Sequence, residues 1–273
     1  MAEVIVNEKQ WRLLQTKVTR KEEEFGHSYW SDDYGWLVGV TTLLDRAIPK
    51  DKGLIEYFKR GDVYEMEERL QETSAQGTRV HKALEQLLEG EKVPLDFLKT
   101  EKEKKCVASF IEWFRIWQPQ NSKSEQVVAY ILKRPDKEID IKYAGTLDLL
   151  CQLDGKWTVI DFKTGRQNDL NHGIQIRSYG EAVKQSYGIE VEKYFTLYLG
   201  TQHTTNAKTT NSVGLPTNGI GWRAVESDFS FDDVVRIYDY AMFLNKGKYP
   251  NPPLVRAYPS EFQLLTKVNK KGV

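Results

Sequence analysis

The stretch from Ala144 to Gly165, AGTLDLLCQLDGKWTVIDFKTG, decides the fold of this chain. It holds two β-prone runs around Asp154-Gly155, and an Asp-Gly turn between such runs is a strong signal for a hairpin. Side chains on a strand alternate between its two faces, so Asp161 and Lys163 should project to the same face. If the two strands pair across the turn, Asp148 lies close to Asp161, and two carboxylates converge with a lysine.

Two like charges held together need a compensating group, and hard divalent cations prefer oxygen ligands. Such a cation polarises a phosphoryl oxygen, activates a water and offsets charge on the leaving oxygen, which is what phosphodiester cleavage requires. A lysine beside it can position the water or stabilise developing charge. An arbitrary Asp-x-Lys is more often a surface ion pair of little energetic value, so the prediction depends on the wider pattern of the chain.

Hydrophobic periodicity predicts helices and strands on both sides of this hairpin. Residues 27–40 indicate a second hairpin with its turn at Asp32–Gly35, and Gly77 favours two helices rather than one in a long helical region. The predicted helices are 41–48, 53–88 with a break at Gly77, 102–117, 170–186 and 231–244; the predicted strands are 127–132, 139–143, 144–153, 157–162, 191–199 and 221–225. This order predicts an α/β (α+β) fold, with a central mixed β-sheet flanked by helices and a helical N-terminal lobe.

Composition limits the class of protein. Lysine plus arginine and aspartate plus glutamate both number 39, which excludes a globally basic coat but not a local basic groove. Two cysteines, Cys106 and Cys151, are too few for a disulfide framework or a four-thiolate iron-sulfur cluster. The sequence has no membrane-spanning apolar run and no signal-peptide core near Met1, so we expect a cytoplasmic protein, in the host cytoplasm if it is viral.

Four short motifs follow one another in a fixed order: Gly77-Thr78-Arg79-Val80-His81, Gly145-Thr146-Leu147-Asp148, Asp161-Phe162-Lys163 and Gln175-Ile176-Arg177-Ser178-Tyr179. In this order the chain resembles the PD-(D/E)XK nuclease superfamily, in its RecB-type branch. The resemblance covers Gly77 to Leu199. It extends more weakly to the N-terminal hairpin and to Val40-Thr41-Thr42-Leu43, a region similar to the start of related phage and mitochondrial genome-maintenance exonucleases. The sequence departs from the pattern at Leu147, where a proline can stand, and at Asp161, where a glutamate can stand.

The resemblance implies a restriction-endonuclease-like core and a role for each motif. His81, Asp148, Asp161 and the Phe162 carbonyl would hold one or two Mg²⁺ or Mn²⁺ ions, and an imidazole ligand suits Mn²⁺ better. Asp148, Asp161 and Lys163 would be catalytic. Gln175 and Tyr179, which share one helix face at i and i+4, would line the site and contact the DNA backbone. Glu125, just before a core strand, is a further candidate to face the site.

The same resemblance divides the chain into a hairpin and helical lobe (1–120), a nuclease core (121–247) and a C-terminal tail (248–273), and implies DNA as the partner. The predicted function is a metal-dependent exonuclease on single-stranded or end-exposed DNA, in replication, recombination or repair and with proteins of those processes. A structure-specific or restriction-like endonuclease and a catalytically silent DNA-binding protein are the alternatives. Trp30, Tyr34 and Trp36 could stack on unpaired bases or belong to the core. The predicted DNA-binding residues are Thr78, Arg79, Lys82, Lys142, Thr164, Arg166 and Arg177.

Overall fold

A computed structural model describes residues 17–23, 26–49, 63–136, 140–200 and 221–244. Within these residues an eight-stranded mixed sheet runs in the order β1-β2-β3-β5-β6-β7-β8, and β4 pairs with β5. The strands are β1 (Val18–Glu23), β2 (Gly26–Ser31), β3 (Gly35–Gly39), β4 (Gln120–Leu132), β5 (Ile141–Leu153), β6 (Lys156–Lys163), β7 (Lys193–Leu199) and β8 (Trp222–Glu226). The helices are α1 (Val40–Ala47), α3 (Val63–Leu88), α4 (Glu101–Trp117), α5 (Asp169–Tyr187) and α6 (Phe231–Leu244), with a short 3-10 turn at Leu95–Phe97.

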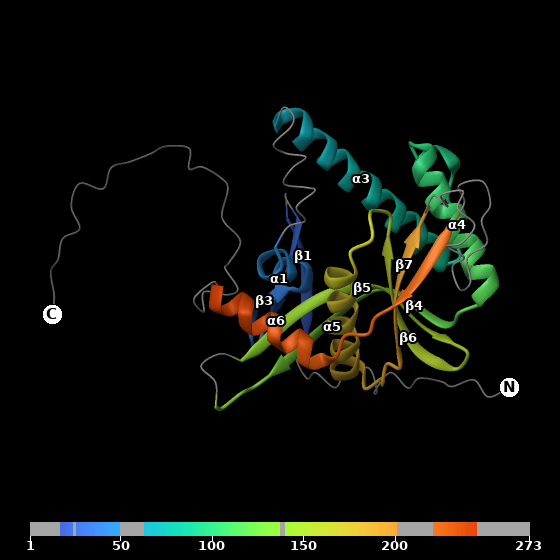
Figure 1. Cartoon of the computed structure of the whole chain (residues 1–273). Helices are drawn as coiled ribbons and strands as arrows, with labels where there is room; N and C mark the ends of the chain where they lie inside the picture. The colour runs from blue at the N-terminus through green and yellow to red at the C-terminus, as the bar shows by residue number, and fades with distance from the viewer. Residues whose placement is uncertain (1–16, 24–25, 50–62, 137–139, 201–220, 245–273) are drawn as a thin grey trace.

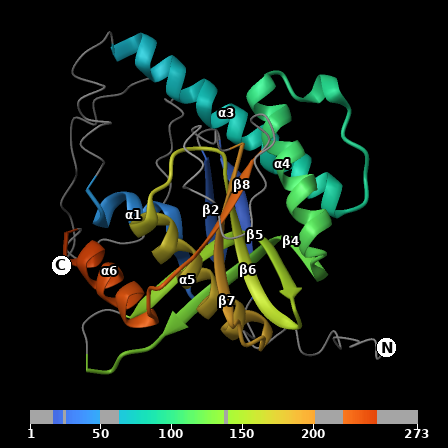
Figure 2. The same cartoon turned by 45° about the vertical axis from the view of Figure 1, so that its right-hand side comes forward.

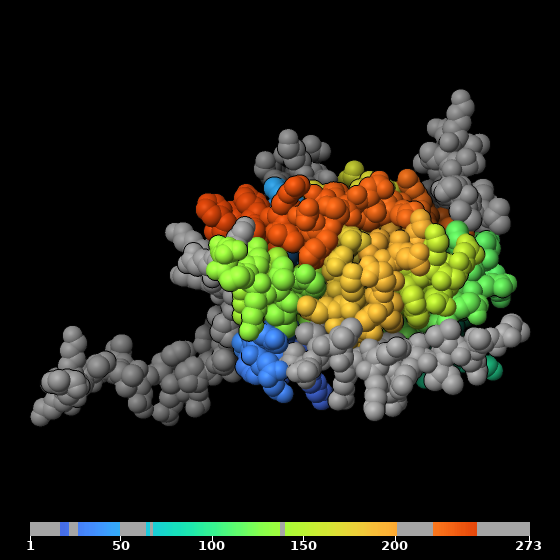
Figure 3. Space-filling view, turned by 90° about the horizontal axis from the view of Figure 1, so that it is seen from below, coloured from blue at the N-terminus to red at the C-terminus, as the bar shows by residue number. Residues whose placement is uncertain are grey.

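Helices cover both faces of the sheet (Figures 1 and 2). On one face α1, α5 and α6 share a core with strand residues such as Leu150 and Val159. On the other face α3 and α4 pack on residues such as Ile160 and Phe162. Seen from below, α6 lies across this end of the molecule beside the strands β4 and β5 and the end of α5 (Figure 3). Burial on both faces explains why neighbouring residues of β5, such as Leu149 and Leu150, are both apolar although they face opposite sides of the sheet. The predicted α/β fold with a central mixed sheet is therefore confirmed.

The central hairpin forms at the predicted turn. Asp154 and Gly155 both have positive φ angles, 49° and 77°, as a two-residue turn between twisted strands requires. The pairing of β5 with β6 runs from Leu149 opposite Ile160 to the turn. The next pair outward would bring Asp148 opposite Asp161, so the local prediction about these two carboxylates gives the correct neighbourhood.

Two of the predicted elements are wrong. The helix α3 continues through Gly77 instead of breaking there. An interior glycine costs only about 1 kcal/mol, and the buried side chains of Val80 and Leu84 on the same helix outweigh that cost. The residues predicted as two strands, 139–143 and 144–153, form the single strand β5. Its partner β4 also begins earlier than predicted, at Gln120, because a register shift lets an irregular segment stay in the sheet.

The strand β5 lies at a fork in the sheet. Along one edge it pairs with β4 over most of its length. Along the other edge it pairs in parallel with β3 at Tyr143 and Ala144, and then in antiparallel with β6 from Leu149 onward. Residues 145–148 lie between these two pairings, where β3 and β6 diverge. The second motif of the chain therefore sits where the sheet opens.

The division of the chain near residues 120 and 247 stays a prediction. The N-terminal hairpin and the central strands share one sheet through the contact of β3 with β5. The tail predicted at 248–273 lies outside the described residues. Among the helices that the structure describes, none is long and apolar enough to cross a membrane.

Candidate active site

Asp148 stands at the fork of the sheet and contacts two other elements. Its Oδ2 accepts a hydrogen bond of 2.6 Å from the backbone N–H of Phe162 in β6. Its Oδ1 lies 3.2 Å from Nδ1 of His81, which reaches across from α3. The Asp148 side chain is 11% exposed, so the carboxylate is held inside the protein with an opening toward solvent. The first and second motifs thus meet although 67 residues separate them.

Asp161 lies beside Asp148 and contacts the side chains of Lys163 and Gln175, and Gln175 in turn contacts Tyr179. Lys163 Nζ forms an ion pair with Asp161 Oδ2 at 2.5 Å, as expected for residues on one face of a strand. From α5, Gln175 Nε2 donates a hydrogen bond to Asp161 Oδ1 at 3.1 Å and lies at the same distance from the hydroxyl of Tyr179. The Tyr179 ring packs directly over Gly145, where a Cβ atom would lie 2.4 Å from the ring. The glycine of the second motif is therefore required by the tyrosine of the fourth.

Glu125 completes a group of potential metal ligands. Ligand atoms of His81, Glu125 and Asp148 all lie within 4.8 Å of one another. Glu125 reaches this position from β4 with a φ angle of 50°, in the left-handed region. Such a conformation costs a non-glycine residue of the order of 1–3 kcal/mol and is frequent at functional sites. Asp161 does not belong to this triad, and Glu125, which the sequence analysis gives only as a further candidate, lies in it.

The charges of the centre shift one another. Burial lowers the pKa of His81, but the Asp148 carboxylate outweighs burial and raises that pKa to about 9. Burial would raise the pKa of Asp148, yet His81 holds it below its ordinary value. Burial raises the pKa of Asp161 against the opposing effect of Lys163. Burial and the nearby Asp148 raise the pKa of Glu125 to about 7.

These residues fit a divalent cation. Within the described part of the chain, the buried Asp161 Oδ2 has an ion pair with Lys163 but no hydrogen bond. Neighbouring buried carboxylates are unfavourable unless a cation compensates them. Carboxylate oxygens with one imidazole form a donor set suited to Mg²⁺ or Mn²⁺. His81, Glu125, Asp148 and Asp161 are therefore the side chains that could hold an ion here.

Comparison with known families agrees with this geometry. A family model described as the PD-(D/E)XK nuclease superfamily matches residues 55–232. The chain belongs to the PD-(D/E)XK nuclease superfamily. Nucleases of this superfamily use divalent metals and would bind DNA. Comparison with curated proteins gives no match. The crystal structure of SSO0001 aligns at 15% identity and a TM-score of 0.40, over 77% of this chain and 76% of that one.

Several predicted DNA-binding residues of this PD-(D/E)XK chain are close in sequence to its motifs and have local contacts. Lys82 follows His81 on α3 and forms an ion pair with Glu85 at 2.6 Å. Thr78 is exposed one turn earlier and donates a hydrogen bond to the Ser74 carbonyl. Arg166 is exposed in the segment after β6, and the Thr164 hydroxyl lies near Gly77 of α3. Contact of these side chains with DNA stays a prediction.

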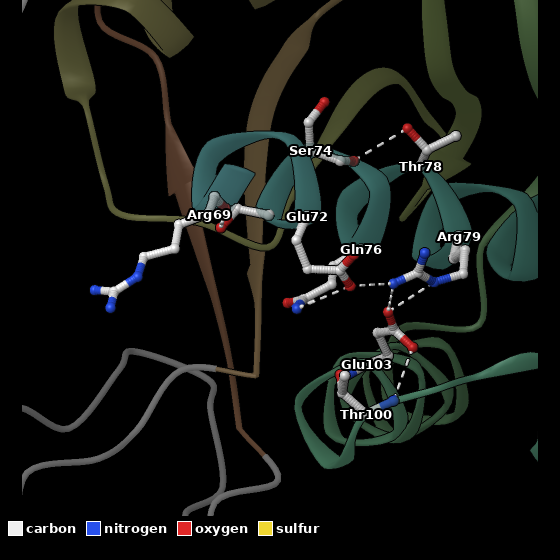
Figure 4. Close-up of polar contacts among 9 residues, drawn as sticks. Arg69, Glu72, Ser74, Gln76, Thr78, Arg79, Thr100 and Glu103 are labelled. Atoms are coloured by element: carbon white, nitrogen blue, oxygen red, sulfur yellow. Dashed lines mark hydrogen bonds and ion pairs between the residues drawn. The ribbon is translucent and has the colours of Figure 1, made fainter. Parts of the chain in front are cut away.

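Arg79 of this PD-(D/E)XK chain lies between Glu72 of its own helix and Glu103 of α4 (Figure 4). Its guanidinium binds Glu103 at 2.7 and 2.9 Å and Glu72 at 2.8 Å. Glu103 is 1% exposed and also accepts from the backbone N–H of Thr100, which closes the capping box of α4. The structure thus gives Arg79 a visible role in joining α3 to α4. It lies two residues before His81, on the opposite side of the helix.

Arg177 and Lys142 also lie apart from the centre. Arg177 forms an ion pair with Glu181 and stacks 4.3 Å from the centroid of the Tyr194 ring. It is two residues after Gln175 on α5, which turns it to another side of the helix. Lys142 precedes Asp148 by six residues on β5, a distance of about 20 Å along a strand. Neither basic side chain is part of the group around Asp148.

The aromatic residues near the N-terminus form their own cluster. Trp30 and Trp36 meet edge to face at 5.1 Å on the hairpin of β2 and β3, and neither is fully buried. The ammonium of Lys21 lies 5.3 Å from the centroid of each ring. These tryptophans are not part of the main cores, and base stacking by them stays a prediction. Cys106 and Cys151 are both free and buried in the core that α3 and α4 share with the sheet, and the Cys106 thiol donates to the Leu199 carbonyl.

Sequence reasoning missed the residues that β1 and β2 bring to the site. Tyr29 and Arg20 both contact the hydroxyl of Thr146, at 3.0 and 3.4 Å. Thr146 is part of the second motif, but the hairpin partners are more than 100 residues away in the chain. His172 lies on α5 three residues before Gln175, and its Nδ1 is 2.7 Å from the hydroxyl of Tyr198 on β7. No local pattern indicates these contacts, because they depend on how distant strands pair.

Proposed function

We propose that this chain is a metal-dependent DNA exonuclease of the RecB-type branch. It hydrolyses phosphodiester bonds of single-stranded or end-exposed DNA, in replication, recombination or repair. The observation that carries the proposal is the convergence of His81, Asp148 and Asp161 beside the Lys163 amine. A catalytically silent relative would have no need to retain this complete set of ligands and amine in one buried group.

Each residue has a chemical task in this proposal. His81, Glu125, Asp148 and Asp161, with the Phe162 carbonyl, would hold one or two Mg²⁺ or Mn²⁺ ions. When bound, such an ion polarises the phosphoryl oxygen and favours ionisation of a water molecule. Lys163 donates hydrogen bonds to the charge that develops on the phosphate.

Supporting residues keep these groups in place. Gln175 orients Asp161 through its 3.1 Å hydrogen bond, and the buried ring of Tyr179 fixes Gln175 in turn. The Asp148 carboxylate is oriented by the backbone N–H of Phe162. His81 must release its proton to act as a ligand, because a metal-binding imidazole is neutral. This pre-organisation reduces the reorganisation needed when substrate arrives.

The preference for a DNA end is supported by the position of α3. This helix supplies His81 and continues past the edge of the sheet (Figure 1). A helix that spans the approach to a catalytic centre favours entry of a free strand end over entry of a continuous duplex. Lys82 and Thr78, on the part of α3 nearest His81, are then suited to guide the phosphates of that strand.

The test uses four DNA substrates, each with Mg²⁺, with Mn²⁺ and with EDTA. Linear single-stranded DNA labelled at the 5′ or the 3′ end, linear duplex and covalently closed single-stranded circles are incubated with the wild-type protein. We expect metal-dependent loss of linear DNA and survival of the circles. Cleavage of the circles would instead identify an endonuclease. Intact DNA that is nevertheless shifted on a gel would identify a silent DNA-binding protein.

A further inference from the structure

The N-terminal hairpin of β1 and β2 reaches the catalytic centre through Arg20. We propose that Arg20 is a phosphate-binding residue that holds the DNA phosphodiester from the β4 side of the centre, across from Lys163 on β6. The inference rests on the proposed function and deepens it, because it assigns the hairpin to the substrate site. Neither the four motifs nor the ligand group includes this residue.

The position of Arg20 is set by well-packed neighbours. Its guanidinium lies 3.6 Å from Glu125 Oε2 and 3.4 Å from the Thr146 hydroxyl. Tyr29, which is opposite Arg20 in the pairing of β1 with β2, is 2% exposed and bonds the same hydroxyl at 3.0 Å. The hairpin is therefore anchored on β5 two residues before Asp148. The Arg20 side chain itself is 30% exposed, so solvent and ligand can reach it.

The charge of the loaded centre explains why another cation is needed. With one divalent ion bound, the three carboxylates of Glu125, Asp148 and Asp161 would be balanced by that ion together with Lys163. A phosphodiester brings one more negative charge, and further charge develops on its oxygens as the nucleophile attacks. Arg20 supplies a positive group that raises the affinity of this neutral centre for a polyanion.

An arginine is chemically suited to this task. Its planar guanidinium can bind two phosphate oxygens at once, and it stays charged at every physiological pH. When Glu125 becomes a metal ligand, its charge is shared with the ion, and its hold on Arg20 weakens. The guanidinium would then be able to donate part of its hydrogen bonding to a phosphate beside Glu125 and Thr146. The ligand is thus a nucleic-acid phosphodiester, and the contact is independent of base sequence.

The alternation of side chains along β1 provides a matched control. Lys21 is the next residue, and it points to the outer face of the hairpin, where it lies over the rings of Trp30 and Trp36. The two side chains carry the same charge on the same strand, but only Arg20 contacts Glu125 and Thr146. If only general positive charge matters, replacing either Arg20 or Lys21 by alanine should weaken DNA binding equally. If Arg20 makes a specific phosphate contact, only the replacement of Arg20 should weaken it.

The experiment compares the wild-type protein with Arg20→Ala, Arg20→Lys and Lys21→Ala. Binding of a labelled single-stranded oligonucleotide is measured in EDTA and in Ca²⁺ over a series of salt concentrations. Binding of Mn²⁺ alone is measured by calorimetry, and cleavage is measured in Mn²⁺ at saturating DNA. We expect Arg20→Ala to bind DNA about tenfold or more weakly and to reduce the slope of log K against log salt by about 1. Arg20→Lys should keep the slope but lose turnover, and Lys21→Ala should match the wild type.

Three results would overturn the inference. One is an unchanged salt slope and affinity in Arg20→Ala while the wild type cleaves. Another is an equal loss in Lys21→Ala, which indicates non-specific attraction. The third is a loss of Mn²⁺ affinity in Arg20→Ala with unchanged DNA binding, since Arg20 would then only position Glu125. Failure of the proposed function looks different: the wild type itself leaves linear DNA intact in Mg²⁺ and Mn²⁺.

Discussion

Replacing Gly145 by alanine should damage catalysis through a chain of contacts rather than through a ligand. The new Cβ would lie 2.4 Å from Cε1 of Tyr179, whereas carbon atoms in contact are about 3.5–4.0 Å apart, so the ring must move by about 1 Å. Tyr179 is 3% exposed and cannot move without disturbing its surroundings. We expect a loss of about 1–3 kcal/mol in the free energy of unfolding, as for other overpacked cores.

The same movement would disconnect the supports of Asp161. The contact between Gln175 Nε2 and the Tyr179 hydroxyl, 3.1 Å in the native protein, would exceed hydrogen-bonding distance after a shift of about 1 Å. Gln175 would then hold Asp161 less firmly, and a misplacement of this size can lower turnover by about 100-fold. Denaturant unfolding measures the first effect, and single-turnover cleavage of labelled DNA measures the second.

Gly180→Ala is the matched control for this substitution. Its Cβ would lie 2.1 Å from Cε1 of Tyr194, so it creates a similar clash on α5, away from Asp161. We expect both variants to lose stability and only Gly145→Ala to lose turnover beyond the loss of folded protein. If the two variants cleave DNA equally well when folded, the Tyr179–Gln175–Asp161 row has no catalytic importance and the reasoning is refuted.

Four further outcomes are expected. Asp161→Asn should abolish metal-dependent cleavage with little change in metal-free unfolding temperature, because burial already raises the pKa of this carboxyl toward the neutral form. Lys163→Ala should bind Mn²⁺ in calorimetry but lose turnover by about 100-fold or more. Glu103→Ala should lower the unfolding temperature, since it removes both the cap of α4 and the partner of Arg79. The affinity for Mn²⁺ should rise with pH through pH 7 and on toward pH 9, because Glu125, with its pKa raised to about 7, and His81, with its pKa raised to about 9, must each lose a proton to bind a metal.

Each of these outcomes has its own check. Wild-type cleavage by Asp161→Asn would remove its assigned role, and lost Mn²⁺ binding in Lys163→Ala would make that residue part of the scaffold. Glu101→Ala is the control for Glu103, because Glu101 is on the same helix turn but 77% exposed. The pKa of Glu125 is about 7 in the fold and 4.5 in the unfolded chain. Protonated Glu125 therefore stabilises the metal-free fold most below pH 4.5, and this stabilisation is lost as the pH rises from 4.5 to about 7. The stabilisation of the fold by added Mn²⁺ should therefore increase with pH, and a flat profile would contradict this assignment.

Local patterns in the sequence predict the part of the site that lies within one hairpin. Strand alternation brings Asp161 and Lys163 to one face, and the Asp154-Gly155 turn brings Asp148 beside them. The helical spacing of Gln175 and Tyr179 also predicts a shared face. These features depend on neighbours within a few residues or across one short turn, which is why the sequence alone specifies them.

Other parts depend on pairings that no local pattern encodes. The contact of Arg20 with Thr146 spans 126 residues and exists only because β3 pairs in parallel with β5. Glu125 faces the site because β4 is irregular at this residue, whose φ angle is positive. The polar residues around it would usually predict a loop rather than a strand. The predicted break of the helix at Gly77 is wrong for a related reason: the tertiary packing of α3 outweighs the local preference of glycine.

The pairing of β3 with β5 also has a consequence for synthesis of the protein. The hairpin that carries Arg20 is translated before β5. Its neighbouring strand β3 can pair with β5 only when Tyr143 and Ala144 have been made. The carboxylate of Asp161 is oriented by Gln175, which lies on α5. Asp161 therefore lacks this hydrogen bond until α5 has emerged from the ribosome. A chain that ends before α5 would keep Asp148, Asp161 and Lys163 but would lack the side chain that orients Asp161.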